Sequence, residues 1–138
     1  MIKLSKKIEY GLLAVQYIAK NSNKIVSAKE ISENMNLSFE FLSKTLQMLM
    51  KHGLIKSVQG INGGYSLTQK PDKISVADII FAIEGKSALV ECFSKDAYLA
   101  CERDNKCSIK SPLRTLQKKI DDVFHSTSIA EIAKIKTI

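Results

Sequence analysis

Two helix signals separated by a short turn are the feature that most constrains how this chain can fold. Ser27 precedes an apolar-periodic run and has Glu30 three residues on. This pattern predicts a capping box, in which the hydroxyl accepts from a backbone amide and the carboxylate reaches back. Ser38 can cap a second helix, which Gly53 can end in a left-handed conformation. Two short helices joined in this way form a helix-turn-helix.

A β-hairpin is predicted directly after the second helix. Residues 54–59 have strand propensity, residues 60–64 are rich in glycine, and residues 65–67 resume the strand. We expect positive φ at Gly63 and Gly64, because glycine adopts it at little steric cost. The expected fold class is therefore mainly α: a winged helix-turn-helix with a small β-hairpin wing.

Charge is distributed unevenly along the chain, whose net charge is +7. Residues 1–70 contain ten Lys against four Glu, a net of +6. Residues 71–138 contain nine Lys and two Arg against ten acidic residues, a net of +1. A phosphate-binding half joined to a nearly neutral half would have this asymmetry. It favours nucleic-acid binding over a winged helix that makes only protein contacts.

Polar side chains lie in the N-terminal half of the second helix, the part that such folds place in the major groove. Gln can read adenine, Glu accepts from cytosine, and Lys reaches guanine or phosphate. The wing can reach the neighbouring backbone or the minor groove. The candidate DNA-binding residues are Ser38, Glu40, Ser43, Lys44 and Gln47 in the helix, and Gln59, Asn62, Gly63, Gly64 and Tyr65 in the wing.

Further helices are expected on both sides of this unit. Residues 4–20 have the apolar spacing of one amphipathic helix, for which Ser5 can serve as the N-cap. Ser75 can cap another helix that continues to about Ile83 and that Gly85 ends.

A longer helix is predicted over residues 112–126. Ser111 followed by Pro112 is a strong helix start, with the serine as the cap. Its apolar stripe exceeds what so small a second half can readily cover, so we interpret it as a dimerisation helix rather than as packing within its own domain. The stripe consists of Leu113, Leu116, Ile120, Val123 and Phe124. Ser128 and Glu131 predict a second capping box that opens a short last helix.

The chain has three cysteines, spaced C-x8-C-x5-C at Cys92, Cys101 and Cys107. An odd count argues against a disulfide framework, and the wide spacing excludes a CxxC redox pair and a zinc finger. Three thiolates on one irregular segment can hold an iron–sulfur cluster with a fourth ligand from elsewhere. Unrelated free thiols and a redox-sensing thiol set are the alternatives.

The sequence argues against an enzyme and a membrane protein. Its two histidines, His52 and His125, are not near the cysteines in sequence, and no plausible acid/base set is present. No apolar run approaches the length of a membrane span, and the N-terminal residues lack the apolar core of a signal peptide. We therefore expect a cytoplasmic protein.

Three stretches have a specific pattern: LSKKIEYGLLA at residues 4–14, SVQGINGGYSL at residues 57–67 and AIEG at residues 82–85. Together with the second helix of the motif, they resemble the Rrf-two family of winged-helix regulators, typified by the iron–sulfur cluster regulator IscR and the nitric-oxide sensor NsrR. The resemblance extends from residue 4 to about residue 132. It implies a homodimer on a pseudo-palindromic double-stranded DNA operator, crossed by the long helix 112–126.

The resemblance also implies a cofactor. The cluster-binding branch of the family has three cysteines where Cys92, Cys101 and Cys107 stand, which implies an iron–sulfur cluster (2Fe-2S or 4Fe-4S). The first gap is longer than the x5 common in that branch, and Lys110 stands where a ligating His is usual. In NsrR-like members an acidic residue of the first helix, donated by the partner subunit, completes the site, and Glu9 is at the matching position.

The arginine that many members have in the wing is replaced here by Gln59. We expect a homodimeric transcriptional repressor that senses iron–sulfur status, nitric oxide or redox state through a Cys-ligated cluster. Residues 1–70 would be the DNA-binding domain, and residues 71–138 the sensor loop and dimerisation region. Two alternatives stay open. One is a regulator of the same fold that uses thiols or protein contacts, and the other is an iron–sulfur or thiol carrier that does not bind DNA.

Overall fold

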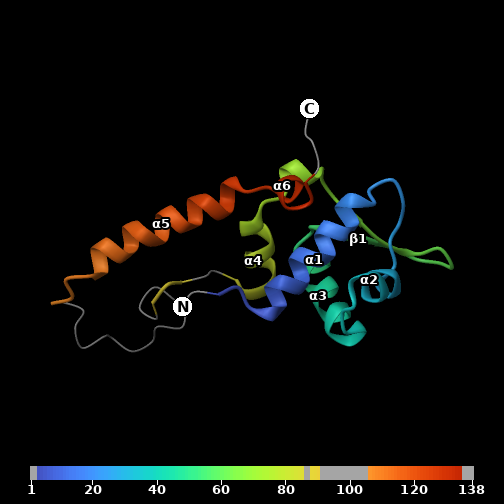
Figure 1. The fold of residues 1–138 in the computed structure, drawn as a ribbon, viewed down its shortest axis with the longest axis horizontal. Coiled ribbons are helices and arrows are strands. Elements are labelled where there is room, and N and C mark those ends of the chain that lie inside the picture. The colour runs from blue at the N-terminus through green and yellow to red at the C-terminus, as the bar shows by residue number, and fades with distance from the viewer. Residues whose placement is uncertain (1–2, 86–87, 91–105, 135–138) are drawn as a thin grey trace.

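The computed structural model describes residues 3–85, 88–90 and 106–134. These residues are mainly helical and contain one two-stranded antiparallel sheet, in the element order of a winged helix (Figure 1). The predicted fold class is confirmed. The elements are α1 (Lys6–Lys20), α2 (Ala28–Met35), α3 (Phe39–Lys51), β1 (Ile55–Val58), β2 (Gly64–Leu67), the 3-10 turn η1 (Pro71–Lys73), α4 (Val76–Glu84), α5 (Lys110–Ser126) and α6 (Ile129–Ile132).

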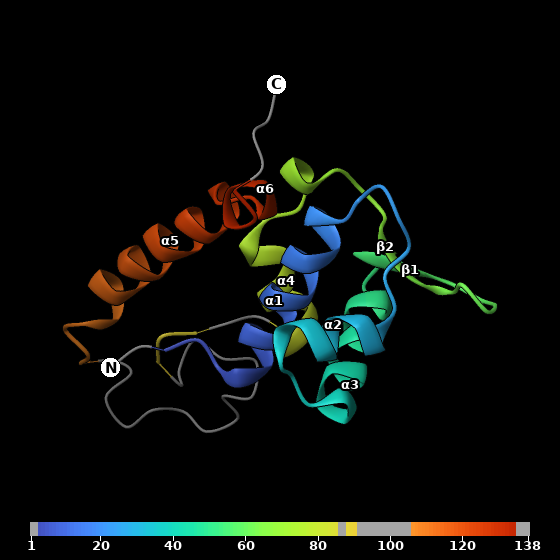
Figure 2. The same cartoon turned by 45° about the vertical axis from the view of Figure 1, so that its right-hand side comes forward.

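Helix α1 lies at the centre of the hydrophobic core and contacts α3, α4 and α6 (Figure 2). Gly11 lies on its buried face, where a Cβ would stand only 2.2 Å from a methyl group of Ile83 in α4. A glycine here lets α1 and α4 approach each other closely. The core is one cluster with members from α3, α4 and α6, on both sides of residue 70. The domain boundary at residue 70 stays a prediction.

Serine hydroxyls cap the first three helices, as predicted. The Oγ atoms of Ser5, Ser27 and Ser38 each accept from the backbone amide three residues on, at 3.3, 3.0 and 3.4 Å. Between α2 and α3, Asn36 adopts the left-handed conformation with φ of 53°, which a short polar side chain tolerates. The turn of the helix-turn-helix is therefore only a few residues long.

The end of α3 is set by Gly53, which has φ of +75°. The Gly53 amide donates to the Met50 carbonyl at 3.0 Å, and the Leu54 amide donates to the Leu49 carbonyl at 3.1 Å. This is the Schellman pattern, accompanied by the usual contact between two buried apolar residues. The chain consequently leaves α3 in the direction of β1, as the sequence predicts.

Two predictions about the C-terminal part are corrected. The box at Ser128 is half formed, because its Oγ accepts from the Glu131 amide at 3.2 Å but the described structure has no return bond. A complete box occurs instead at Ser75. Its Oγ accepts from the Asp78 amide, and its own amide donates to the Asp78 carboxylate. Ser111 is not a cap: α5 already begins at Lys110 and lacks a side-chain cap bond.

Candidate nucleic-acid interface

Helix α3 presents a polar row to solvent. The side chains of Ser38, Glu40, Lys44 and Gln47 are exposed, and that of Ser43 is half-buried. The opposite face of the same helix is fixed in the core, with Leu42, Leu46 and Leu49 fully buried. All five helix residues predicted from sequence therefore lie together on one accessible surface. They are suitably arranged to enter a major groove.

The start of α3 is held by an aromatic pair from α1. The rings of Tyr10 and Phe41 meet edge to face with their centroids 4.7 Å apart. The Tyr10 hydroxyl also accepts from the backbone amide of Ser38 at 3.3 Å. These contacts orient the start of α3, from which the polar side chains extend along the exposed face of the helix.

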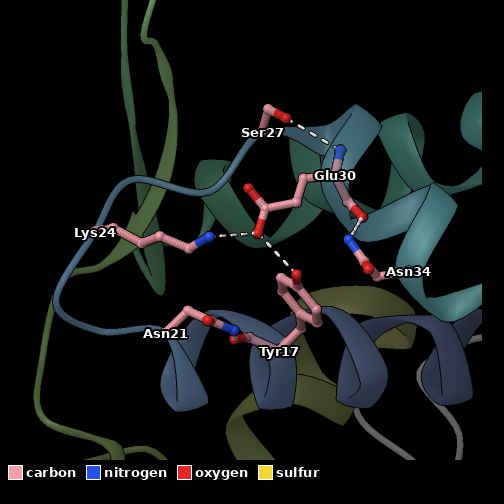
Figure 3. A network of polar contacts seen from close by, with 6 residues as sticks. All are labelled: Tyr17, Asn21, Lys24, Ser27, Glu30 and Asn34. Carbon is pink, nitrogen blue, oxygen red and sulfur yellow. Dashed lines mark hydrogen bonds and ion pairs between the residues drawn. The ribbon is translucent and has the colours of Figure 1, made fainter.

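A polar network joins α1 to α2 (Figure 3). The Glu30 carboxylate was predicted to reach back to the Ser27 backbone, and this is wrong. Its Oε2 accepts instead from the Tyr17 hydroxyl at 2.7 Å and from Lys24 Nζ at 2.9 Å. The Asn34 amide group donates to the Glu30 carbonyl at 2.8 Å. Through these two bonds the carboxylate ties α2 to Tyr17 of α1 and to Lys24 of the loop between the two helices.

The network changes the acidity of Glu30 and of Tyr17. The hydrogen bond from Lys24, and then that from Tyr17, lowers the pKa of Glu30 below its ordinary value. The same hydrogen bond to Glu30 raises the pKa of Tyr17. The ionised carboxylate with a neutral phenol is thus the arrangement that holds α2 in place.

The wing is a regular antiparallel hairpin. Val58 pairs with Gly64 next to the turn, and Ile55 pairs with Leu67 at the base. Val26, just before α2, pairs with Tyr65 through backbone bonds of 2.7 and 3.1 Å. Tyr65 packs against the core, so it lies at the base of the wing and away from its tip.

The prediction of positive φ at Gly63 and Gly64 is wrong, because among the described glycines only Gly53, Gly60 and Gly85 have it. Both predicted positions need glycine for a different reason. A Cβ on Gly63 would stand 2.3 Å from the Val58 carbonyl oxygen, and one on Gly64 would stand 2.4 Å from that of Val26. These glycines therefore allow close backbone approach across the hairpin and toward α2.

Two exposed apolar residues on this surface were missed by the sequence analysis. Phe39 in the first turn of α3 has a relative exposure of 52%, and Ile61 in the wing turn has one of 104%. Gln59 and Asn62, both predicted, are exposed on either side of Ile61. The position of Ile61 within a glycine-rich turn was a signal for its exposure.

The predicted metal ligands are described only in part. Cys92 and Cys101 lie outside the described residues, while Cys107 is a half-buried free thiol that suits iron. Glu9 is exposed on α1, with its carboxylate 3.3 Å from Lys6 Nζ. Such an exposed pair is weak, so the carboxylate is accessible to a second subunit. Among the described residues, no three His, Cys, Asp or Glu side chains lie close enough together to hold a metal ion.

Comparison with known proteins decides the family. The profile of the Rrf2 family, described as an iron-dependent transcriptional regulator, matches residues 4–135. The chain belongs to the Rrf2 family. This is the Rrf-two family that its motifs resemble, so that prediction is confirmed. The transcriptional regulator NsrR of Bacillus licheniformis is 30% identical over 132 residues, which are 95% of this chain and 92% of NsrR.

Solved structures of Rrf2 relatives agree with the fold described above. CymR, the global cysteine regulator of B. subtilis, is similar with a TM-score of 0.78 at 31% identity, over 99% of this chain and 100% of CymR. IscR of T. potens is similar with a TM-score of 0.75 at 34% identity, over 96% of this chain and 87% of IscR.

The family establishes the general function. This Rrf2 protein is a transcriptional regulator and not an enzyme, as predicted, and regulators of the family bind DNA. None of the helices within the described ranges has the length and apolar character needed to cross a membrane.

Proposed function

We propose that this Rrf2 protein is a homodimeric repressor that inserts α3 of each subunit into successive major grooves of a double-stranded operator. The observation that carries the proposal is the exposed polar row on α3, next to a projecting wing in the basic half of the chain. Ser38, Glu40, Ser43, Lys44 and Gln47 would face the groove. Gln59, Asn62 and the backbone at Gly63 and Gly64 would follow the flanking strand, whereas Tyr65, predicted as a DNA contact, holds the base of the wing.

The proposed dimer is supported by the uncovered apolar face of α5. The described structure buries no residue of α5, and the relative exposures of Leu116 and Val123 are 44% and 59%. Phe124, by contrast, packs against the core of its own subunit. A second α5 packed antiparallel would cover the exposed positions and would place two α3 helices in one two-fold arrangement.

The proposed sensor is the segment that joins the end of α4 to the start of α5. Cys92, Cys101 and Cys107, with Glu9 of the partner subunit, would hold an iron–sulfur cluster, which would supply a site that reacts with oxidants and nitric oxide. Thiolates are the ligands that iron–sulfur clusters favour, and a carboxylate is a harder and weaker ligand. The segment is covalently continuous with α4 and α5, so a change in its conformation would act on both helices.

Coupling from this segment to DNA would run through α4. Glu84, the last residue of α4, accepts from the Ser5 hydroxyl, the cap of α1. Helix α4 also contacts α3 directly. A displacement of α4 would therefore alter how α3 is presented, and a tenfold change in operator affinity requires only about 1.4 kcal/mol.

A second candidate is a regulator that senses through its thiols without a cluster. The described thiol, Cys107, forms no disulfide and is only half-buried, so it can react with a second thiol or with an oxidant. The likeness to CymR, a cysteine regulator, also favours this candidate. In this case Cys92 and Cys101 would be the reaction partners of Cys107 rather than fellow ligands.

The decisive experiment is the visible absorption spectrum of anaerobically purified protein, together with its operator affinity before and after exposure to air. A cluster would give visible colour in the wild type and none in Cys101→Ala. Glu9→Ala would keep its colour anaerobically but lose it faster in air than the wild type. Lys6→Ala, which removes the partner of Glu9 within the subunit, is the matched control and should behave as the wild type does.

Other outcomes separate the candidates. A colourless wild type whose DNA affinity still changes on thiol oxidation would favour the second candidate. A protein that binds no duplex under any of these conditions would contradict DNA binding and leave the carrier alternative.

A further inference from the structure

Ile61 is the large apolar residue that the described structure leaves most exposed, with a relative exposure of 104%. It stands in the turn between β1 and β2, and both ribbon views show this hairpin projecting beyond the helices (Figures 1 and 2). An isoleucine in that position gains no burial on folding and contributes nothing to the core. Single exposed apolar residues are common on protein surfaces. The geometry of the turn therefore has to indicate whether the exposure of Ile61 is functional.

The turn that presents Ile61 is tightly built. The Gly63 amide donates to the Gly60 carbonyl at 3.0 Å, which closes the turn around Ile61. Gly60 has φ of +120°, a backbone conformation that residues with a side chain rarely adopt. At Gly63 there is no room for a Cβ beside the Val58 carbonyl. Two glycines with separate constraints thus hold one isoleucine at the apex.

The base of the wing is fixed to the core of the protein. Tyr65 pairs with Val26 through two backbone bonds and packs against the core. Val26 itself is fully buried and immediately precedes the cap of α2. The apex is therefore held at a defined place relative to α2 and α3, and so also relative to the exposed polar residues of α3.

We propose that Ile61 is an apolar wedge that enters the DNA minor groove beside the site read by α3 and partly unstacks a base step there. The inference rests on the proposed DNA-binding function and adds a specificity-determining residue to it. Isoleucine has no donor or acceptor, so it cannot bind a phosphate or read a base edge by hydrogen bonding. What remains is apolar contact with sugars and base faces, for which other minor-groove proteins use Phe, Leu, Ile or Met.

The wedge predicts a sequence preference at positions that α3 does not touch. Pyrimidine–purine steps such as TA and CA unstack and kink more easily than other steps. An operator bound by two wings should therefore have such a step at the same distance outside each half-site. The exposed amides of Gln59 and Asn62 can bond the minor-groove acceptors on either side of the wedge.

The test is selection of binding sites from a pool of random-sequence duplexes. The wild type is compared with Ile61→Ala, with Ile61→Leu and with Ile109→Ala, which removes the same side chain from a 58% exposed position at the N-terminus of α5. We expect the wild type to enrich a palindrome with flanking pyrimidine–purine steps. Ile61→Ala should keep the palindrome, lose the flanking preference and bind about tenfold more weakly. Ile61→Leu and Ile109→Ala should both retain the flanking steps.

A spectroscopic readout identifies the unstacking itself. With 2-aminopurine in the flanking step, binding of the wild type should raise its fluorescence, and binding of Ile61→Ala should not. Thermal unfolding midpoints should be the same for both proteins, because the side chain is fully exposed. If Ile61→Ala selects the same flanks and gives the same fluorescence rise, the wedge is wrong, although DNA binding stands. If the wild type enriches no sequence, the proposed function fails and the wedge fails with it. If only transcription with RNA polymerase depends on Ile61, the tip contacts protein instead.

Discussion

The Tyr17 hydroxyl donates a hydrogen bond of 2.7 Å to the Glu30 carboxylate, which joins the C-terminal part of α1 to the first turn of α2. Lys24, in the intervening loop, lies 2.9 Å from the same oxygen. One carboxylate therefore holds three consecutive parts of the chain, and the helix-turn-helix is oriented on the core helix by polar as well as apolar contacts (Figure 3).

Removing the Glu30 charge should lower stability at neutral pH. The folded pKa of Glu30 lies below its ordinary value of 4.5, so its stabilisation is present above that value and is lost as the pH falls through the folded pKa. We expect Glu30→Gln to reduce the free energy of unfolding by about 1 kcal/mol at pH 7. The difference from the wild type should shrink as the pH falls below 4.5 and through the folded pKa, as measured by denaturant unfolding. Glu33→Gln, on the exposed face of α2, is the control. Equal stability of the two variants at pH 7 would contradict this role.

DNA affinity should depend strongly on salt, because Lys supplies nearly all the positive charge of residues 1–70. Each lost phosphate contact reduces the slope of log affinity against log salt by about 0.9. We expect Lys44→Ala to weaken binding and, through the loss of one phosphate contact, to reduce that slope by about 0.9. Lys118→Ala, on the exposed side of α5 beside Asp122, should leave both values unchanged. A flat salt response of the wild type, measured by fluorescence anisotropy, would count against DNA binding.

Charges on the uncovered face of α5 should dissociate the proposed dimer. Leu116→Asp and Val123→Asp place carboxylates at positions that are exposed in one subunit, so the subunit fold should survive. Burying either carboxylate between two subunits without a partner would cost several kcal/mol. Sedimentation should then show a folded monomer. Lys118→Asp, on the opposite side of the helix, should stay dimeric, and a dimeric Leu116→Asp/Val123→Asp protein would place the interface elsewhere.

Gly64 should be intolerant of any side chain. A Cβ there would approach the Val26 carbonyl oxygen to 2.4 Å, so Gly64→Ala must push the wing away from the start of α2. We expect a loss of about 2 kcal/mol in the free energy of unfolding, together with weaker operator binding. Gly53→Asn is the comparison, because its φ of +75° suits Asn and a Cβ there meets nothing within 4 Å. Gly64→Ala with wild-type melting and binding would show that the wing does not need this close approach.

Local signals were read correctly where the chain satisfies its own backbone within a few residues. Ser38 caps α3 through a bond to Phe41, three residues on. At the other end of α3, the amides of Gly53 and Leu54 donate to carbonyls three and five residues earlier. The hairpin followed from strand propensity around a glycine-rich turn. Spacing predicted these features because both partners lie in the same short window.

The candidate site was predictable as a set of positions, but its supporting contacts were not. The polar residues of α3 follow from helical periodicity once Leu42, Leu46 and Leu49 are assigned to the core. Whether Tyr65 lies at the tip or at the base of the wing depends on its pairing with Val26, 39 positions earlier in the chain. Sequence spacing contains no information about such a pairing.

The sequence by itself determined the winged helix, its basic half and the cysteine pattern, because helix caps, alternation and charge are written in adjacent residues. Only the tertiary structure decided that Glu30 binds Tyr17 rather than its own helix cap, since that choice depends on a phenol brought in from α1. Only the tertiary structure decided that Gly64 serves close approach rather than positive φ, because the Val26 carbonyl that excludes a Cβ comes from another segment. In both cases the deciding atom lies far away in sequence and close in space, and packing alone brings the two together.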